Sequence, residues 1–167
     1  MAEKINKIHC IGCHAEVPDI NEPAHEYIGA SPGCWAIYTS ILKKQYGEYG
    51  YPELEHRLTV DTYAVQHPGK PSKKSIQSVA VHLISLYYIL EKDFTGKMSI
   101  KTIQQALHNK DKYTWLEPPD PIGKTTILDV EKAKDLKEHK IIVKEWAIDV
   151  WKAWSAHHDI IKKWADL

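Results

Sequence analysis

The stretch SIQSVAVHLISLYYILE, residues 75–91, decides the fold class. Its apolar residues recur at the three- and four-residue spacing of an α-helix, which places Ile76, Val79 and Leu83 on one face. Further apolar residues widen this face almost all round, a pattern typical of a helix that its neighbours bury. The uncharged part of the stretch is 16 residues long, which is short for a bilayer span. We therefore expect a buried central helix.

Sequence signals for helix starts predict four more helices around this one. Ser31 followed by Pro32 is typical of a helix start, because serine caps free backbone N–H groups and proline fits the first turn. The pair Asp135 and Glu138 predicts a capping box at the start of the last long helix. After this helix, Ser155 either caps a new segment or lies within a continuing helix. The predicted ranges are 31–46, 52–66, 99–108 and 135–154, and a further short helix is compatible with 125–134.

Length and composition favour a single helical domain. The chain has 167 residues, of which 43% are apolar and 26% charged, an ordinary mixture for a globular protein. We find no internal repeat and no convincing strand. The sequence predicts an all-α fold of about five helices in one bundle-like domain over residues 1–167. Residues 1–30 show no sustained period, so we expect an irregular, zinc-knuckle-like leader that packs on a helical body of residues 31–167.

The balance of charge excludes several classes of partner. Lysine and arginine together number 22, as do aspartate and glutamate, so the chain lacks the basic excess of a nonspecific nucleic-acid or membrane-surface binder. We expect neither nucleic acid nor membrane as a partner, while a small molecule in an interior pocket and a homo-oligomer are both compatible with the sequence. The first thirty residues hold no apolar run typical of a signal peptide, so we expect a cytoplasmic protein.

Three cysteines form the strongest chemical signal in the chain. Cys10 and Cys13 stand at a spacing that lets two thiolates reach one Zn²⁺ ion, and Cys34 supplies a third thiol. One histidine would complete a tetrahedral site, and His67 and His157 are the two candidates. An odd number of cysteines in a chain without an export signal favours a metal over disulfides.

Other interpretations of these cysteines stay open. The Cys10–Cys13 pair could consist of incidental reduced thiols, and a redox role is disfavoured because the pair does not open a helix after a strand. Cys34 lies in the first turn of a predicted helix, where the helix dipole favours a thiolate. It could therefore be a metal ligand, a nucleophile or a small core residue.

Three ionisable residues on apolar helix faces form a second candidate site. Asp61 lies on the apolar stripe of the helix over 52–66, where a carboxylate must be paired, hydrogen-bonded or metal-bound. If they meet, Asp61, His82 and His157 would line a catalytic pocket, with Asp61 as base or as the partner that orients a histidine. A salt bridge of Asp61 with Arg57 and a purely structural role for His82 are the plainer alternatives.

Five short motifs are spread over most of the chain. They are C-x-x-C at 10–13, SPGCW at 31–35, HRLTVDTYAVQHPG at 56–69, QSVAVHL at 77–83 and WSAHH at 154–158. Together they resemble an uncharacterised bacterial family of unknown function. The resemblance implies a bacterial intracellular protein, and it brings no activity and no catalytic residues.

A weaker likeness is to the DinB-like metal-binding helical bundles, which hold a divalent metal with three histidines in hydrolases and thiol transferases. That group has a His-x-x-x-His pair near its C-terminus, whereas this chain has adjacent His157 and His158. The likeness therefore concerns the helical architecture only and implies no shared function.

Three functions are compatible with these observations. In the first, a small helical protein binds zinc and uses it as a structural centre. In the second, a metal-dependent hydrolase or small-group transferase works in the pocket of Asp61, His82 and His157. In the third, a metal-free interaction module offers its tryptophan-rich last helix to a partner protein. The sequence favours the zinc site and does not decide whether the protein is an enzyme.

Overall fold

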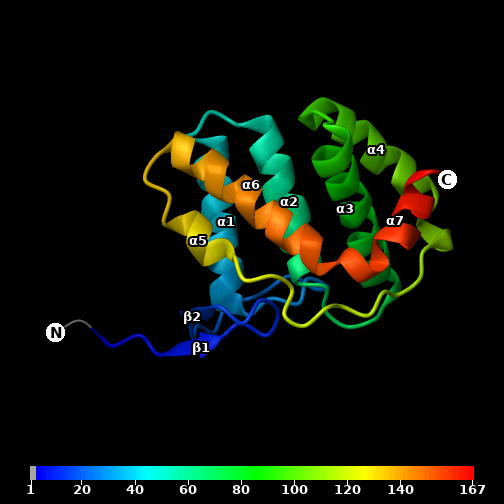
Figure 1. Cartoon of the computed structure of the whole chain (residues 1–167). Coiled ribbons are helices and arrows are strands. Elements are labelled where there is room, and N and C mark those ends of the chain that lie inside the picture. Colours follow the sequence, from blue (N-terminus) through cyan, green and yellow to red (C-terminus); the bar gives the residue numbers. More distant parts are fainter. Residues whose placement is uncertain (1–2) are drawn as a thin grey trace.

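Helices make up most of the computed structural model, which describes residues 3–167 (Figure 1). The helical class is as predicted, but this part of the chain holds seven α-helices instead of about five. The additional ones are short helices on either side of α6. The α-helices are α1 (Pro32–Tyr46), α2 (Glu53–Gln66), α3 (Lys73–Lys92), α4 (Gly96–His108), α5 (Ile127–Glu131), α6 (Leu136–Ala153) and α7 (His158–Ala165). Two 3-10 turns, η1 (Lys110–Lys112) and η2 (Ser155–His157), follow α4 and α6.

Most of the described leader lacks regular structure, as predicted, but it contains a short β-hairpin that the sequence analysis did not predict. The strands β1 (Lys7–His9) and β2 (Glu16–Pro18) pair antiparallel, with Ile8 opposite Val17. Strands of three residues are too short to show alternation in a sequence, and for that reason the pattern gave no signal. In Figure 1 the hairpin lies beneath the start of α1, and Val17 is fully buried.

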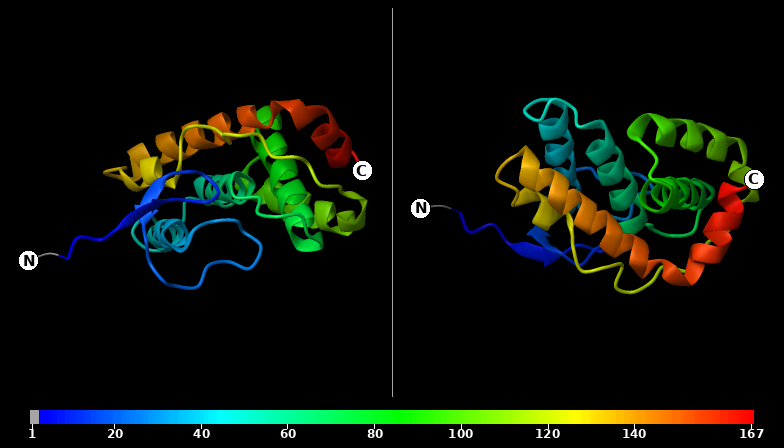
Figure 2. Two further views of the ribbon diagram at one scale, coloured as in Figure 1. Left: turned by 90° about the horizontal axis from the view of Figure 1, so that it is seen from below. Right: turned by 45° about the horizontal axis from the view of Figure 1, so that its top comes forward.

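The helix α3 is central, as the sequence predicts. It contacts α2, α4, α6 and α7, which surround it in Figure 2, and Leu83 and Leu86 are fully buried. It starts at Lys73, two residues before the predicted start, because Ser72 and Ser75 cap each other's backbone N–H groups. Among the residues that the structure describes, no helix combines the length and apolarity needed to cross a membrane.

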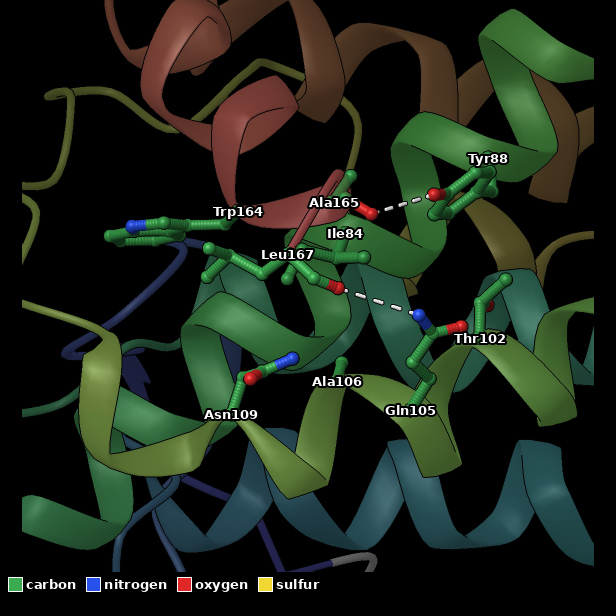
Figure 3. A pocket seen from close by; sticks show the side chains of 9 residues that line it. All are labelled: Ile84, Tyr88, Thr102, Gln105, Ala106, Asn109, Trp164, Ala165 and Leu167. Atoms are coloured by element: carbon green, nitrogen blue, oxygen red, sulfur yellow. Dashed lines mark hydrogen bonds between the residues drawn. The ribbon is translucent and has the colours of Figure 1, made fainter.

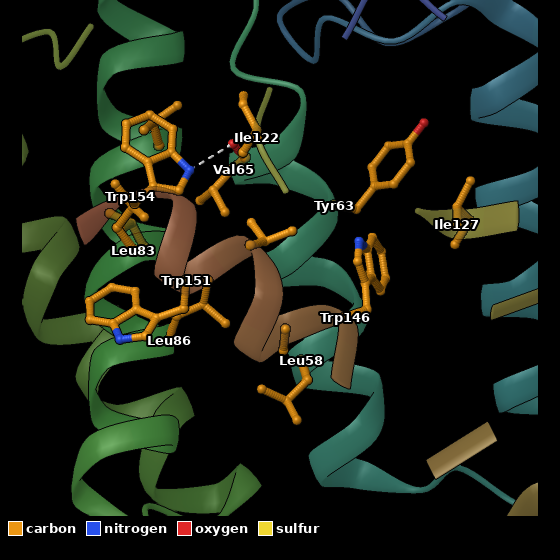
Figure 4. Packing of buried hydrophobic residues seen from close by; sticks show 14 of the residues in the cluster. Leu58, Tyr63, Val65, Leu83, Leu86, Ile122, Ile127, Trp146, Trp151 and Trp154 are labelled. Atoms are coloured by element: carbon orange, nitrogen blue, oxygen red, sulfur yellow. Dashed lines mark hydrogen bonds between the residues drawn. The ribbon is translucent and has the colours of Figure 1, made fainter. Parts of the chain in front are cut away.

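The helix α6 covers α2 with buried tryptophans, as Figure 4 shows. Trp146 and Trp154 are fully buried. The indole N–H of Trp146 donates to the side-chain oxygen of Gln66 at 3.0 Å, and that of Trp154 donates to the carbonyl oxygen of Val65 at 3.2 Å. Both bonds fix the last turn of α2, which directly precedes His67.

The C-terminal helix α7 closes the bundle against α3 and α4. The hydroxyl of Tyr88 donates to the carbonyl oxygen of Ala165 at 2.8 Å. The side-chain amide of Gln105 donates to the carbonyl oxygen of Leu167 at 3.4 Å (Figure 3). The cavity between these elements measures about 10 Å³, close to the least that one water molecule needs. It is a packing gap and not a ligand pocket.

One predicted boundary was wrong for a local reason. The helix α4 starts at Gly96 and not at Ser99, because the hydroxyl of Thr95 accepts a hydrogen bond from the N–H of Met98. Ser99 lies inside the helix and donates its hydroxyl to the carbonyl oxygen of Gly96 at 2.7 Å. A serine that bonds back to the preceding turn resembles a cap in sequence without being one.

Candidate metal centre

The turn of the hairpin carries two of the three thiols. Cys10 directly follows β1, its N–H donates to the carbonyl oxygen of Ala15 at 2.8 Å, and its own carbonyl oxygen accepts from the N–H of His14 at 3.0 Å. Cys13 lies inside this turn and is half-buried. Gly12 has no room for a side chain, because a Cβ atom there would overlap the ring of His67. The glycine therefore lets the turn lie directly on the end of α2.

The third thiol is on α1, and Ser31 ties that helix to the hairpin turn. Cys34 lies in the first turn of α1 and is fully buried. Ser31 stands at the N-cap position, but its hydroxyl does not cap its own helix. It accepts a hydrogen bond from the N–H of Ile11 at 2.9 Å instead. The helix start and the thiol-bearing turn are thereby held together.

The four donor atoms of Cys10, Cys13, Cys34 and His67 all lie within 4.8 Å of one another. The Sγ atoms of Cys13 and Cys34 are 3.9 Å apart, and the Sγ of Cys34 is 3.5 Å from the Nε2 of His67. Cys10, Cys34 and His67 are at most 1% exposed. This set is the Cys₃His combination that the sequence predicts, with His67 as the histidine that joins the thiols.

The orientation of His67 fixes which ring nitrogen is free. Its Nδ1 lies 2.8 Å from the carbonyl oxygen of Tyr63, and because a carbonyl only accepts, Nδ1 carries the proton. The lone pair is then on Nε2, which faces Cys34. Histidine ligands in proteins are commonly oriented by such a bond from the second nitrogen.

The sulfur atoms receive hydrogen bonds from neighbouring groups. The Sγ of Cys10 accepts from the backbone N–H of Gly12 at 3.5 Å and from that of Ser31 at 3.4 Å. The Sγ of Cys34 accepts from the hydroxyl of Tyr63 at 3.3 Å. Donors aimed at sulfur stabilise thiolates, so the surroundings suit charged sulfurs.

Mutual hydrogen bonds among the thiols spread their pKa values apart. The hydrogen bond from Cys13 lowers the pKa of Cys10, while the same pairing raises the pKa of Cys13 to about 12. The hydrogen bond with Cys10 also raises the pKa of Cys34. Burial raises the pKa of Tyr63, with Cys34 as the next cause, so its phenol stays protonated as a donor. Charge concentrates on Cys10, and the second and third thiolates need a cation beside them.

His157, the other predicted ligand, does not belong to this cluster. Its Nε2 lies 2.8 Å from the carbonyl oxygen of Glu117 in the long loop after η1. The chain breaks out of α6 at Trp154 and passes through η2, so His157 does not continue the apolar stripe of α6. Among the described residues, the donor atoms that converge with the thiols therefore include His67 and not His157.

The other two predicted site residues do meet. The Nδ1 of His82 lies 2.7 Å from the Oδ1 of Asp61, which is fully buried. Arg57 forms an ion pair with the same carboxylate at 2.9 Å, the plainer partner that the sequence suggests. Ser85 donates its hydroxyl to the Oδ2 of Asp61. A catalytic role for Asp61 and His82 stays a prediction.

Tyr63 and Ser31 are the site residues whose roles sequence reasoning missed. Tyr63 stands four positions before His67, one helical turn away, so the spacing alone allows both to face one site. The sequence around Ser31 indicates only a helix cap. Nothing local in the sequence shows that its hydroxyl instead holds the hairpin turn.

Comparison with known proteins identifies a family and no function. Residues 8–155 match a family described as a family of unknown function (DUF5946). No curated protein and no solved structure shows a significant match to the chain.

Proposed function

The chain belongs to the DUF5946 family of unknown function, and from its cysteine–histidine cluster we propose that it binds one Zn²⁺ ion as a structural centre. The ligands are Cys10, Cys13, Cys34 and His67. The metal joins the N-terminal hairpin to the helical body. The observation that carries the proposal is the convergence of these four donor atoms to within 4.8 Å of one another.

Two of the separations between the donor atoms match those of a tetrahedral zinc site. With Zn–S bonds of about 2.3 Å and a Zn–N bond of about 2.0 Å, tetrahedral angles put two sulfurs about 3.8 Å apart and a sulfur and a nitrogen about 3.5 Å apart. The distances here are 3.9 Å for Cys13 to Cys34 and 3.5 Å for Cys34 to His67. Little rearrangement would therefore be needed to close these two edges of the tetrahedron around an ion.

The donor chemistry favours zinc over the common alternatives. Thiolate and imidazole are ligands for Zn²⁺, whereas Mg²⁺ and Ca²⁺ prefer carboxylate and carbonyl oxygens. Three thiolates and one neutral histidine would leave the centre with a net charge of about −1. The N–H donors of Gly12 and Ser31 and the hydroxyl of Tyr63 are placed to offset that charge.

A structural role fits better than a catalytic one. Four protein ligands fill a tetrahedral site and leave no position for water or substrate. The ligands come from three segments that are distant in sequence: the hairpin turn, the start of α1 and the residue after α2. The ion would therefore link the leader to two helices.

Metal analysis of purified protein tests the proposal. We expect about one zinc ion per chain in the wild type, and loss of zinc in the variants Cys10→Ser, Cys34→Ser and His67→Gln. His9→Gln is the matched control, because His9 is exposed, directly precedes Cys10 and lies outside the cluster. Full zinc content in the His67 variant, or none in the wild type, would contradict the proposal.

A further inference from the structure

A second candidate site lies between the end of the leader and the first helices. Two hollows of about 300 Å³ and about 140 Å³ share Tyr27, Ser78 and His82 as lining residues. The larger one extends outward along α3 to Leu107 of α4. The smaller one reaches inward to Trp35 of α1. Both hollows therefore border the His82 side chain.

Asp61 holds His82 in one orientation. The carboxylate can only accept, so the 2.7 Å contact means that Nδ1 of His82 donates the proton. Asp61 is itself fixed, because Arg57 and Ser85 occupy its oxygens and no part of it is exposed. The lone pair of the neutral imidazole must therefore be on Nε2.

The Nε2 atom of His82 is free to meet a ligand. Within residues 3–167, no group of the protein hydrogen-bonds to it, and the side chain keeps 19% of its surface exposed. Asp61 on the Nδ1 side is completely buried, and the His82 side chain lines both hollows. A histidine held by a buried carboxylate on one nitrogen, with the other nitrogen open to a cavity, is arranged as a general base.

The walls of the hollows indicate what kind of ligand fits. Among the described residues, no charged side chain lines the inner hollow, and several of its walls are aromatic rings. His25 packs edge-on against Tyr27 and lies 5.2 Å from the ring of Trp35. In the outer hollow the amine of Lys74 is paired with Glu26 at 2.9 Å. Among the described residues that line the hollows, an anionic or phosphorylated ligand finds no unpaired cation, whereas an uncharged planar ring finds aromatic surfaces to stack on.

We propose that these hollows bind a small, uncharged aromatic molecule with an acidic O–H or N–H group, and that His82 accepts its proton. In this step the O–H or N–H bond of the ligand breaks, and its electron pair stays on the ligand. The proton forms a new bond to Nε2 of His82. Asp61 stabilises the imidazolium that results. The site uses no atom of the proposed zinc centre.

Para-nitrophenol is a suitable probe, because its phenolate form is coloured and its phenol form is nearly colourless. Below the pKa of the free phenol, wild-type protein should produce a saturable rise in phenolate absorbance, since bound phenol transfers its proton to His82. The variant His82→Gln should lose this rise and bind the probe roughly tenfold more weakly, because a hydrogen bond with a charged partner is lost.

Two controls separate this proposal from other effects. His108→Gln, an exposed histidine at the end of α4, should leave the absorbance change intact. Zinc content should be the same in the His82 variant as in the wild type, so a failure of the zinc proposal would be seen separately. No saturable rise with the wild type, or an equal rise with His82→Gln, would overturn the inference.

A measurement on the wild type covers the case in which the His82 variant does not fold. Nitrogen NMR of the imidazole ring should show a proton on Nδ1 and a free lone pair on Nε2 of His82, and both nitrogens protonated when para-nitrophenol is bound. A proton on Nε2 in the free protein would overturn the inference, because no base would then face the hollow.

Discussion

The Nδ1 of His67 donates a 2.8 Å hydrogen bond to the carbonyl oxygen of Tyr63, one helical turn earlier in α2. The hydroxyl of the same tyrosine donates to the Sγ of Cys34 at 3.3 Å. Tyr63 thus supports two of the four proposed zinc ligands, one through its backbone and one through its side chain. The last turn of α2 therefore positions two of the proposed zinc ligands.

Tyr63→Phe tests the side-chain part of this support. The variant removes the hydrogen bond to Cys34 and keeps the backbone bond to His67. We expect zinc affinity to fall by roughly tenfold, as for other partners that orient metal ligands. Competition with a chromophoric chelator measures the change. Tyr88→Phe removes a comparable hydroxyl bond far along α3 and should leave zinc affinity unchanged.

Gly12→Ala tests the close approach of the hairpin turn to α2. A Cβ atom at this position would overlap the His67 ring, so either the turn or the ligand must move. We expect a loss of about 1–3 kcal/mol in the free energy of unfolding, together with weaker zinc binding. Chemical denaturation of the zinc-loaded protein measures the first effect.

Gly47→Ala is the matched control for that experiment. A Cβ atom there meets only the carbonyl oxygen of Lys43, at 3.4 Å, and the position is remote from the thiols in sequence. The variant Gly47→Ala should lose far less free energy of unfolding than Gly12→Ala, and it should retain its zinc. Equal losses of unfolding free energy and of zinc binding in the two variants would show that the close contact of Gly12 with His67 does not cause them.

Removing the metal should expose the thiols. Cys10 and Cys34 are at most 1% exposed, so alkylating reagents should reach them only after the leader has come away from the helices. We expect slow alkylation in the zinc-loaded protein and rapid modification of all three cysteines after chelation. Mass spectrometry of the alkylated protein measures both rates. The same slow rate before and after chelation would mean that the leader is held without metal.

A buried histidine outside the cysteine–histidine cluster predicts how stability changes with pH. Burial lowers the pKa of His139 to about 4, with the charge of Lys44 as a smaller cause. Its Nε2 accepts a hydrogen bond from the amide of Gln45 at 2.9 Å, and this amide also donates to Thr59. The neutral imidazole is therefore the form that fits the folded protein.

The sign of the effect follows from that lowered pKa. The unfolded chain takes up the proton near pH 6.5, whereas the folded chain resists it down to about pH 4. The contribution of His139 to the free energy of unfolding is thus complete above pH 6.5, the pKa in the unfolded chain. It is lost as the pH falls toward about 4, the pKa in the folded protein. It amounts to up to about 3 kcal/mol. His139→Gln should flatten the fall in unfolding free energy over this interval relative to the wild type, and an unchanged slope would contradict the assignment.

The ranges of α1 and α2 could be predicted because their ends are marked by residues that act locally. Pro32 and Gly47 flank α1, and Pro52 and Pro68 flank α2. The hairpin could not be predicted, since three-residue strands leave no period to detect. Its turn contacts Ser31 before α1 and His67 after α2, and no local pattern reveals these partners.

The candidate site could likewise be predicted from the sequence only in part. Residue chemistry and spacing indicated three thiols and one histidine, but choosing His67 over His157 required knowing that η2 interrupts the last helix. The pairing of Asp61 with His82 was a hypothesis from two separate helix faces. Only the packing of α2 on α3 brings those faces together.

X-ray absorption at the zinc edge of the purified protein tests the central claim most directly. We predict a first shell of three sulfur atoms at about 2.3 Å and one nitrogen at about 2.0 Å, with no oxygen ligand. A shell of nitrogen and oxygen atoms alone, or a folded protein that holds no zinc, would contradict a structural centre built from Cys10, Cys13, Cys34 and His67.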